Sequence, residues 1–288
     1  MKKYLPHICI LTAGITWGMI GLFKRSLGAL GVDVLQRVTI RNFGALLVLT
    51  VIFAFIRRDV FRVKLRHLPL FMGSGIVSVL GLSIVYFGCQ MECSLAVAGI
   101  LLYLAPSFVV VMSALLWRAP ITRRKVTALV LALIGCALVS GIAGGGLTAS
   151  PRGLLLGVAS GFCYATYTIF AHYVLDHYDS LTRTYWTFVF AGLGSLAFWD
   201  TPAITATLAD GRGSVGALGL AVIATALPYL LYTKGLEGVE SGKASIIANV
   251  EPVVGALVGV FVFGETLSLW VILGIVCVLG GVLLLAKE

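Results

Sequence analysis

The feature that most constrains this chain is its succession of continuous apolar stretches, each about 20 residues long, joined by short polar segments. The 288 residues are 59% hydrophobic and only 11% charged, whereas a soluble domain carries roughly 25% charged residues. A water-soluble core cannot absorb this much apolar surface, so the surrounding medium is predicted to be lipid. The apolar runs do not alternate with every second residue, which favours helices over the strands of a membrane barrel.

These stretches predict about ten membrane-spanning helices. They cover residues 8–28, 34–56, 68–88, 95–117, 124–141, 152–171, 183–200, 215–234, 243–263 and 267–286. The longest polar stretches between them are 200–214 and the Gly-rich 142–152, and neither is long enough for a soluble domain. The predicted fold class is therefore an all-α integral membrane protein.

The C-terminal half of the sequence repeats the N-terminal half at a constant offset, which Pro106 and Pro252 define (252 − 106 = 146). The same offset pairs Tyr86 with Tyr232, Ala98 with Ala244, Val130 with Val276, Leu133 with Leu279, Gly135 with Gly281 and Leu138 with Leu284. We predict a first five-helix repeat over 1–142, a Gly-rich connection over 143–151 and a second five-helix repeat over 152–288. An odd number of spans makes the second repeat enter the membrane from the opposite side. The prediction is thus two inverted repeats around a central cavity, with a binding site near the membrane midplane.

The net charge of +9 comes from basic residues that are concentrated in alternate loops. They precede the first span (Lys2, Lys3), follow the second (Arg57, Arg58, Arg62, Lys64, Arg66) and follow the fourth (Arg118, Arg123, Arg124, Lys125). The positive-inside rule places such loops in the cytoplasm, so we predict a multi-pass protein of the inner (plasma) membrane with both termini cytoplasmic. Because the charge is explained as an orientation signal, we expect no nucleic-acid partner.

The six cysteines give no clear sign of a metal or cofactor site. Cys89 and Cys93 are close enough in sequence to pair or to bind a metal, but no second pair of ligands accompanies them. Cysteines inside spans act as small hydrophobes, so we expect no metal and no cofactor. The small residues of Gly14-xxx-Gly18 favour close packing within the chain over a dimer, and monomer and homodimer both stay open.

Ionisable side chains inside a span are costly in lipid and usually face a cavity or a partner. Glu251 is the main candidate, because it precedes the helix-loosening Pro252 in the middle of the ninth span. It either anchors a cationic group, carries a coupling proton, or bonds a neighbouring helix for packing alone. Asn249 occupies the repeat position of Tyr103, where a polar group suits either a midplane site or a bond between helices.

Aromatic side chains with polar groups occur in the middle of four spans: Trp17, Tyr86, Tyr164, Tyr167 and Tyr232. A wall of such rings suits an amphipathic metabolite or a cation. Any single one is more commonly a packing or interface residue, so we expect about two or three of them to line the cavity. Together with Tyr103, Asn249 and Glu251 they form the predicted substrate-binding set.

Two further charged residues lie in or beside spans. Arg41, roughly two turns into the second span, has three open roles: pairing with a carboxylate, binding an anionic substrate or, as the leading interpretation, extending to the outer membrane surface. Glu265 follows Gly264 near a helix end and is interpreted as a structural cap of the tenth span.

No P-loop, HExxH or paired CxxC motif is present in the sequence, which disfavours an enzyme.

Several segments together resemble one known family. They are Trp17-Gly18, Arg41, Leu104-Ala105-Pro106, the run from Asn249-Val250-Glu251-Pro252 to Phe263-Gly264-Glu265-Thr266-Leu267, Gly274 and Gly280-Gly281. In two copies that cover essentially the whole chain, the sequence resembles the EamA family of the drug/metabolite transporter superfamily. The resemblance implies ten helices in two inverted five-helix repeats, a central substrate cavity, and export of small metabolites, including amino acids, across bacterial inner membranes. The first copy departs from the pattern where Ala105 and Ala119 replace the carboxylates of Glu251 and Glu265.

Three functions remain open at this stage, each with the lipid bilayer as surroundings and a small molecule as partner. The first is a secondary transporter of small organic metabolites, an exporter of an amino-acid-like or similar amphipathic solute that works by alternating access. The second is a polyspecific exporter of aromatic or quaternary cations, which one carboxylate among aromatic rings would also suit. The third is an integral membrane lipid-modifying enzyme.

Overall fold

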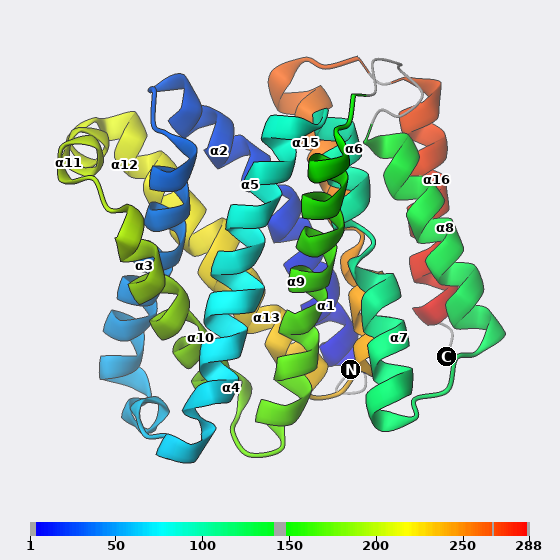
Figure 1. Cartoon of the computed structure of the whole chain (residues 1–288), viewed down its shortest axis with the longest axis horizontal. Coiled ribbons are helices and arrows are strands. Elements are labelled where there is room, and N and C mark those ends of the chain that lie inside the picture. The colour runs from blue at the N-terminus through cyan, green and yellow to red at the C-terminus, as the bar shows by residue number, and fades with distance from the viewer. Residues whose placement is uncertain (1–3, 141–147, 267, 287–288) are drawn as a thin grey trace.

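The structure is a computed structural model that describes residues 4–140, 148–266 and 268–286, apart from the side chains of Ala96 and Ala286. Within these ranges the chain is built from helices, and the sole β-type pairing is an isolated bridge between Cys93 and Ala149. Figure 1 shows the long helices standing side by side in one bundle, with the short α11 and α12 at one end of it. The all-α membrane class predicted from the apolar stretches is confirmed.

The first half of the chain contains helices α1 to α8. Their bounds are α1 Leu5–Gly18, α2 Ile20–Ala29, α3 Val34–Ile56, α4 Leu68–Met72, α5 Leu82–Glu92, α6 Leu95–Leu102, α7 Ala105–Trp117 and α8 Arg123–Val139. A π-helical segment, Gly73–Gly81, joins α4 to α5, and short 3₁₀ turns lie at Arg58–Phe61 and Leu65–His67.

The second half contains helices α9 to α16. Their bounds are α9 Pro151–Leu175, α10 Ser180–Ser195, α11 Thr201–Ala209, α12 Gly211–Leu218, α13 Leu227–Leu236, α14 Ser241–Ala248, α15 Glu251–Phe263 and α16 Leu269–Ala286. A second π-helical segment, Gly219–Ala226, joins α12 to α13, and a 3₁₀ turn, Leu196–Phe198, follows α10.

The 146-residue offset that the two prolines define in the sequence also relates the beginnings of several helices. It takes the start of α1 to that of α9, α3 to α10, α7 to α15 and α8 to α16, and it takes Gly73 to Gly219 at the start of the π-helical segments. The same backbone irregularities therefore recur in both halves of the chain. Arg118 and Gly264, 146 residues apart, even share a left-handed backbone conformation with φ of 55° and 68°.

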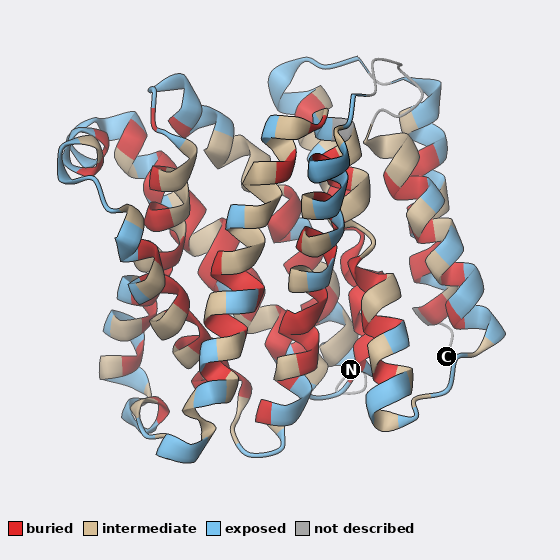
Figure 2. Cartoon of the chain, in the orientation of Figure 1, coloured by how far each residue is buried: buried red, intermediate tan, exposed pale blue. Residues whose placement is uncertain are grey.

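Seven helical stretches in the described part of the chain are long and apolar enough to cross a membrane by length and composition, and Leu269–Leu285 is a shorter apolar helix. Figure 2 shows buried residues on the faces turned toward the bundle interior and exposed residues on the outer faces and at both ends. Large apolar side chains are fully turned outward on several helices, with Phe55, Leu115 and Phe261 between 78% and 84% exposed. A water-soluble protein does not expose apolar surface on this scale, so these faces contact lipid.

Two of the spans are broken in the middle, at positions related by the repeat offset. The helix is interrupted at Tyr103-Leu104 between α6 and α7, and at Asn249-Val250 between α14 and α15. Pro106 and Pro252 are each the second residue of the helix that resumes, where a missing N–H leaves no bond unmade. The loosening predicted at Pro252 is therefore present as a two-residue turn, in which the N–H groups of Asn249 and Val250 donate to carbonyl oxygens three residues earlier.

Glycines of α1 let this helix lie directly against the break in the ninth span. A Cβ atom placed on Gly14 would lie 2.9 Å from the carbonyl oxygen of Ala248, and one on Gly18 would lie 2.6 Å from that of Glu251. Both distances are too short for a side chain, so only glycine permits this approach. The predicted small-residue packing within the chain thus has a specific result, because it fixes Trp17 beside Glu251.

Candidate functional site

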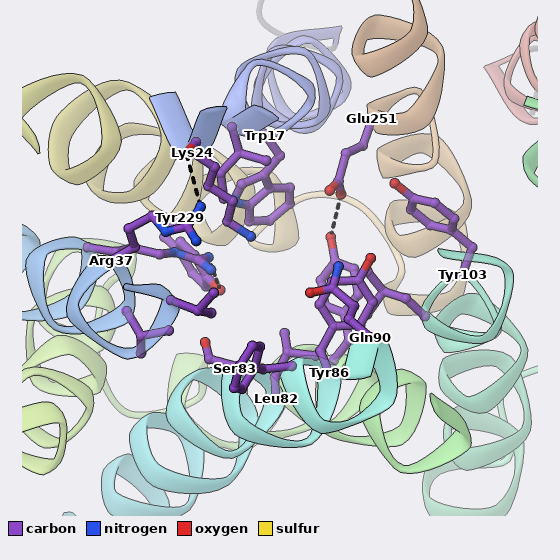
Figure 3. Close-up of a pocket in the computed structure, with 17 residues that line it drawn as sticks. Trp17, Lys24, Arg37, Leu82, Ser83, Tyr86, Gln90, Tyr103, Tyr229 and Glu251 are labelled. Atoms are coloured by element: carbon purple, nitrogen blue, oxygen red, sulfur yellow. Dashed lines mark hydrogen bonds between the residues drawn. The ribbon is translucent and has the colours of Figure 1, made fainter. Parts of the chain in front are cut away.

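A cavity of about 360 Å³ lies inside the bundle, walled by α1, α2, α3, α5, α9 and α13 and by the two helix breaks (Figure 3). This volume is at the small end of the range for sites that enclose a small organic molecule. Lys24 of α2, the start of α3 and the end of α5 contribute to its walls, and these parts of the chain lie toward the upper edge of the bundle in Figure 1.

The cavity is lined by three cationic side chains and one carboxylate: Lys24, Arg37, Arg41 and Glu251. Figure 3 shows Lys24 and Arg37 on one side and Glu251 with Tyr103 on the opposite side. Charges at such depth are unfavourable unless they have partners, water or a ligand. Opposite walls of opposite charge can orient a bound molecule that carries an anionic and a cationic group.

Glu251 is the first residue of α15, directly after the break in the ninth span. The N-terminal end of a helix carries partial positive charge, which favours a carboxylate there. The Tyr164 hydroxyl donates a hydrogen bond to Glu251 Oε2 at 3.1 Å. Helix end and phenol therefore hold the carboxylate in place while it still faces the cavity.

Arg41 turns into the bundle. Its Nε donates to Thr225 Oγ1 at 3.2 Å and its Nη2 to the Tyr229 hydroxyl at 3.4 Å. The guanidinium also lies 6.0 Å from the centre of the Tyr229 ring. The leading interpretation of the sequence, extension to the outer membrane surface, is wrong, because partners on α13 and its π-helical segment hold Arg41 at the cavity wall.

Lys24 and Arg37 form the cationic side of the cavity with Arg41. Arg37 Nη1 donates to the backbone carbonyl of Lys24 at 3.0 Å, which ties the start of α3 to α2. No carboxylate lies within ion-pair distance of Lys24, Arg37 or Arg41 among the residues that the structure describes. These three groups are therefore available to an anionic ligand.

Four aromatic members of the predicted set line the cavity with Glu251: Trp17, Tyr86, Tyr103 and Tyr164. Trp17 makes edge contacts to Tyr164 and Tyr229, with ring centres 6.1 Å and 5.2 Å apart. These contacts fix the rings as a wall without using all of their hydrogen-bonding groups. Of the five mid-span aromatics, three line the cavity: Trp17, Tyr86 and Tyr164.

Three other members of the predicted set lie outside this cavity. Tyr167 and Tyr232 are buried next to its aromatic wall, where their hydroxyls bond Thr233 Oγ1 at 2.8 Å and Thr168 Oγ1 at 2.9 Å. Asn249 is 4% exposed and its Nδ2 has no partner. It shares a separate space of about 20 Å³ with Tyr232. Substrate binding by these three residues stays a prediction.

Sequence reasoning missed Lys24, Arg37, Tyr229 and the amide of Gln90, all of which line the cavity. A signal existed for Lys24, since it lies inside the predicted first span and the rule applied to Glu251 applies to it equally. Arg37 lies near the start of a predicted span, where a lone cation is easily taken for an interface residue. For Tyr229 and Gln90 no signal distinguishes them from packing residues.

Two further sequence interpretations can be placed. Glu265 forms an ion pair with Arg25 at 2.6 Å, which links the end of the ninth span to α2. Its proposed capping of the tenth span involves residue 267, which lies outside the described residues. Cys89 and Cys93 are free thiols buried beside α9, and the described residues hold no group of three or more His, Cys, Asp or Glu suited to a metal ion.

A helical bundle with lipid-facing outer surfaces and a charged cavity among its helices defines a class of membrane protein that binds a small solute within the bilayer. The chain belongs to the EamA-like transporter family, whose model matches residues 5–141 and 151–287. The resemblance identified in the sequence is thereby confirmed. The protein is a multi-pass membrane transporter whose partners are a small-molecule substrate and the lipid bilayer.

Relatives of known name are also transporters. An uncharacterized transporter of Archaeoglobus fulgidus is 32% identical over 286 residues, covering 97% of this chain and 95% of that protein. The uncharacterized inner membrane transporter YicL of Salmonella typhimurium is 29% identical over 216 residues, covering 74% of this chain and 71% of its own length. A solved crystal structure shares the fold with a TM-score of 0.77 at 19% sequence identity, covering 97% of this chain and 95% of that one.

Proposed function

We propose that the protein is a secondary transporter that exports a small amphipathic solute, amino-acid-like in bearing both an anionic and a cationic group, by alternating access. The observation that carries this proposal is the arrangement of charge in the cavity, where Lys24 and Arg37 lie opposite Glu251 (Figure 3) and Arg41 adds a third cation to the lining. A carboxylate would bind the cationic side, an amine would bind Glu251, and an apolar body would pack on Trp17 and the tyrosines.

We infer that ten spans form two inverted repeats around this cavity. The equal offsets between helix starts support two copies of one unit. In Figure 1, α1 begins at the lower edge of the bundle whereas α9, which the offset relates to it, begins at the upper edge. Such a relation places the binding site between the repeats and gives two equivalent ways of closing it.

We further propose that the lower edge in Figure 1 faces the cytoplasm, with both termini there, in the inner membrane. The basic residues that follow α3 and α7 support this orientation, because those helices end at that edge. The cavity would then open toward the outside in this conformation, as its walls include the parts of α2 and α5 near the upper edge.

The alternative exporter of aromatic or quaternary cations is supported by the aromatic rings around Glu251 but opposed by the three cationic side chains. A purely cationic solute would meet more repulsion than attraction, with two unit charges in excess in a region of low dielectric. The lipid-modifying enzyme has no such support, because the family and the named relatives are transporters.

The proposal is tested with three probes that share one ring: phenylalanine, phenethylamine and 3-phenylpropionate. We expect the zwitterion to raise the melting temperature of the purified protein the most, the anion less and the amine least, because binding stabilises the folded state. Counterflow in proteoliposomes then reports transport, which needs two sealed compartments and separates a transporter from an enzyme active in detergent. The direction of net flux follows from oriented vesicles.

Matched variants identify the site in the same assays. Lys24→Gln removes a cation from the cavity wall, whereas Arg25→Gln removes its neighbour, which pairs with Glu265 outside the cavity. We expect Lys24→Gln and Glu251→Gln to weaken zwitterion binding by roughly 10- to 100-fold, since a charge-assisted bond contributes about 1.5–3 kcal/mol. If phenethylamine were the only one of the three probes to raise the melting temperature, and if Arg41→Gln left this rise unchanged, the result would instead favour the cation exporter.

A further inference from the structure

Arg183, one turn inside α10, is a charged side chain sealed within the bundle, with 0% of its surface exposed. Its guanidinium donates to Thr233 Oγ1 at 2.8 Å, to Ser74 Oγ at 3.2 Å and to the carbonyl oxygen of Tyr167 at 2.7 Å. Its Nε has no hydrogen-bond partner. In the described part of the chain no carboxylate lies within ion-pair distance of it. A buried cation without a counter-ion is strongly unfavourable, so packing alone is a poor reason for an arginine here.

The repeat offset of 146 residues takes Arg37 to Arg183. Each arginine lies four residues after an aspartate, Asp33 or Asp179, that caps the N-terminus of its helix. In both cases the backbone N–H of the arginine donates to the backbone carbonyl oxygen of that aspartate at 3.0 Å. The two side chains thus occupy equivalent places in the two repeats. In this conformation one lines the open cavity and the other is sealed away.

One arginine from each half of the chain contacts the π-helical segment of the other half. Arg41 bonds Thr225 in the segment Gly219–Ala226, and Arg183 bonds Ser74 in the segment Gly73–Gly81. π-Helical turns are uncommon and are frequently found at functional sites. Their contact with arginine in both halves indicates that the surroundings of Arg183 are a second version of the cavity wall.

Two aromatic rings in edge-to-face contact, Tyr229 and Tyr167, connect the cavity wall to Arg183. Tyr229 lines the cavity and accepts a hydrogen bond from Arg41. Its ring centre lies 4.8 Å from that of Tyr167 at 79°, and the Arg183 guanidinium lies 3.6 Å from the Tyr167 ring centre. Around Arg183 the hydroxyl groups of Thr233 and Ser74 accept its hydrogen bonds, and Ser74 Oγ lies 3.0 Å from Thr187 Oγ1. A small separation of α10, α13 and the π-helical segment would replace these neutral partners with water.

We propose that Arg183 is the anion-binding residue of the opposite access state, in which it faces a water-filled cavity open to the other side and receives the anionic group that Arg37 and its neighbours hold in the present state. The proposal rests on the transport function proposed above. It assigns Arg183 a ligand of stated chemistry, a carboxylate or another small anion, in place of a permanent structural role.

The experiment uses two serines of one span, Ser74 beside Arg183 and Ser83 on the cavity wall. Each is changed to cysteine, Ser74→Cys and Ser83→Cys, and labelled in spheroplasts and in inverted vesicles with anionic methanethiosulfonate ethylsulfonate or with its cationic trimethylammonium analogue. The parent protein with its native cysteines gives the background. We expect the cysteine at position 83 to react from one face of the membrane and that at position 74 from the other.

The ratio of the two labelling rates reports the charge beside each cysteine. The reagents differ by two unit charges, and at about 6 Å in water this difference changes the rate ratio roughly tenfold for each nearby cation. We therefore expect Arg183→Gln to lower the anion-to-cation ratio at position 74 by roughly tenfold, Arg183→Lys to preserve it, and both to leave position 83 unchanged. Arg37→Gln is the matched control, because it should lower the anion-to-cation ratio at position 83 and leave the ratio at position 74 unchanged.

The outcomes separate this inference from the proposed function. The inference is overturned if position 83 reacts from one face of the membrane while position 74 reacts from neither. It is also overturned if Arg183→Gln leaves the anion-to-cation rate ratio at position 74 unchanged. In either case Arg183 has only a structural role. If position 83 itself reacts from neither face, the proposed transport cavity fails first. A normal reaction at position 83 in each Arg183 variant shows that the variant is folded.

Discussion

Replacing Gly18 by alanine is expected to separate α1 from the break in the ninth span. The added Cβ would lie 2.5 Å from Val254 Cβ and 2.6 Å from the carbonyl oxygen of Glu251, whereas ordinary contacts begin at 3.4 Å. The backbones must therefore move apart by about 1 Å, and overpacking of this kind costs about 1–3 kcal/mol.

Gly21, one turn further along the same predicted span, is the matched control. A Cβ atom there meets nothing within 4 Å, so Gly21→Ala brings only the better helix propensity of alanine, up to about 1 kcal/mol. Gly18→Ala brings the same gain and the overpacking in addition. The two variants should thus differ by about 1–3 kcal/mol, or roughly 2–12 °C in melting temperature.

The measurement is thermal unfolding in detergent, followed by tryptophan fluorescence, together with phenylalanine binding and counterflow. We expect Gly18→Ala to melt below Gly21→Ala and to bind the probe more weakly, because a displaced Glu251 no longer faces the cationic wall. Equal melting temperatures for the two variants would refute the close approach on which the position of Glu251 depends.

Two ion pairs at the lower edge of the bundle give further predictions. The Arg57 guanidinium beside Asp59 holds the pKa of that carboxyl below its usual 3.8, so the pair stabilises the fold above this pH and the contribution is lost as the pH falls through the lower folded-state value. Asp59→Asn should therefore lower the melting temperature slightly at pH 7, with a gap to the wild type that narrows as the pH falls below about 3.8; a gap that widens in acid would contradict this. Lys125 is 3% exposed and donates to Glu240 and to the carbonyl oxygen of Pro120. Glu240→Gln should cost about 2 kcal/mol, because it removes the counter-ion of a buried ammonium, and adding Lys125→Met should restore most of the loss in the same melting assay.

The helix breaks were predictable because their cause is local. Proline cannot continue a helix in the normal way, and two prolines at the same repeat position indicate two breaks without any knowledge of packing. The importance of Glu251 followed from the same local argument, since an ionisable group inside an apolar span needs a cavity or a partner. Trp17, Tyr86, Tyr103 and Tyr164 were included through their polar groups and mid-span positions.

The direction in which a side chain points was less predictable. In a soluble helix the apolar stripe marks the buried face, but a membrane helix is apolar on its lipid face as well as its packed face. Arg41 was therefore expected to extend to the membrane surface, whereas Thr225 and Tyr229 hold it at the cavity wall. Tyr167 and Tyr164 are nearly one turn apart on α9, yet Tyr164 lines the cavity and Tyr167 is buried outside it.

The sequence by itself determined the membrane class, the offset between the two copies and the places where helices break, because these depend on hydropathy, residue spacing and backbone chemistry along a single chain. Only the tertiary structure decided which charges meet. Lys24, Arg37 and Arg41 come from α2 and α3 whereas Glu251 comes from α15, and close packing at Gly14 and Gly18 holds α1 against the break before that helix. Their common cavity, and the seclusion of Arg183 from it, result from contacts between distant segments that no local pattern records.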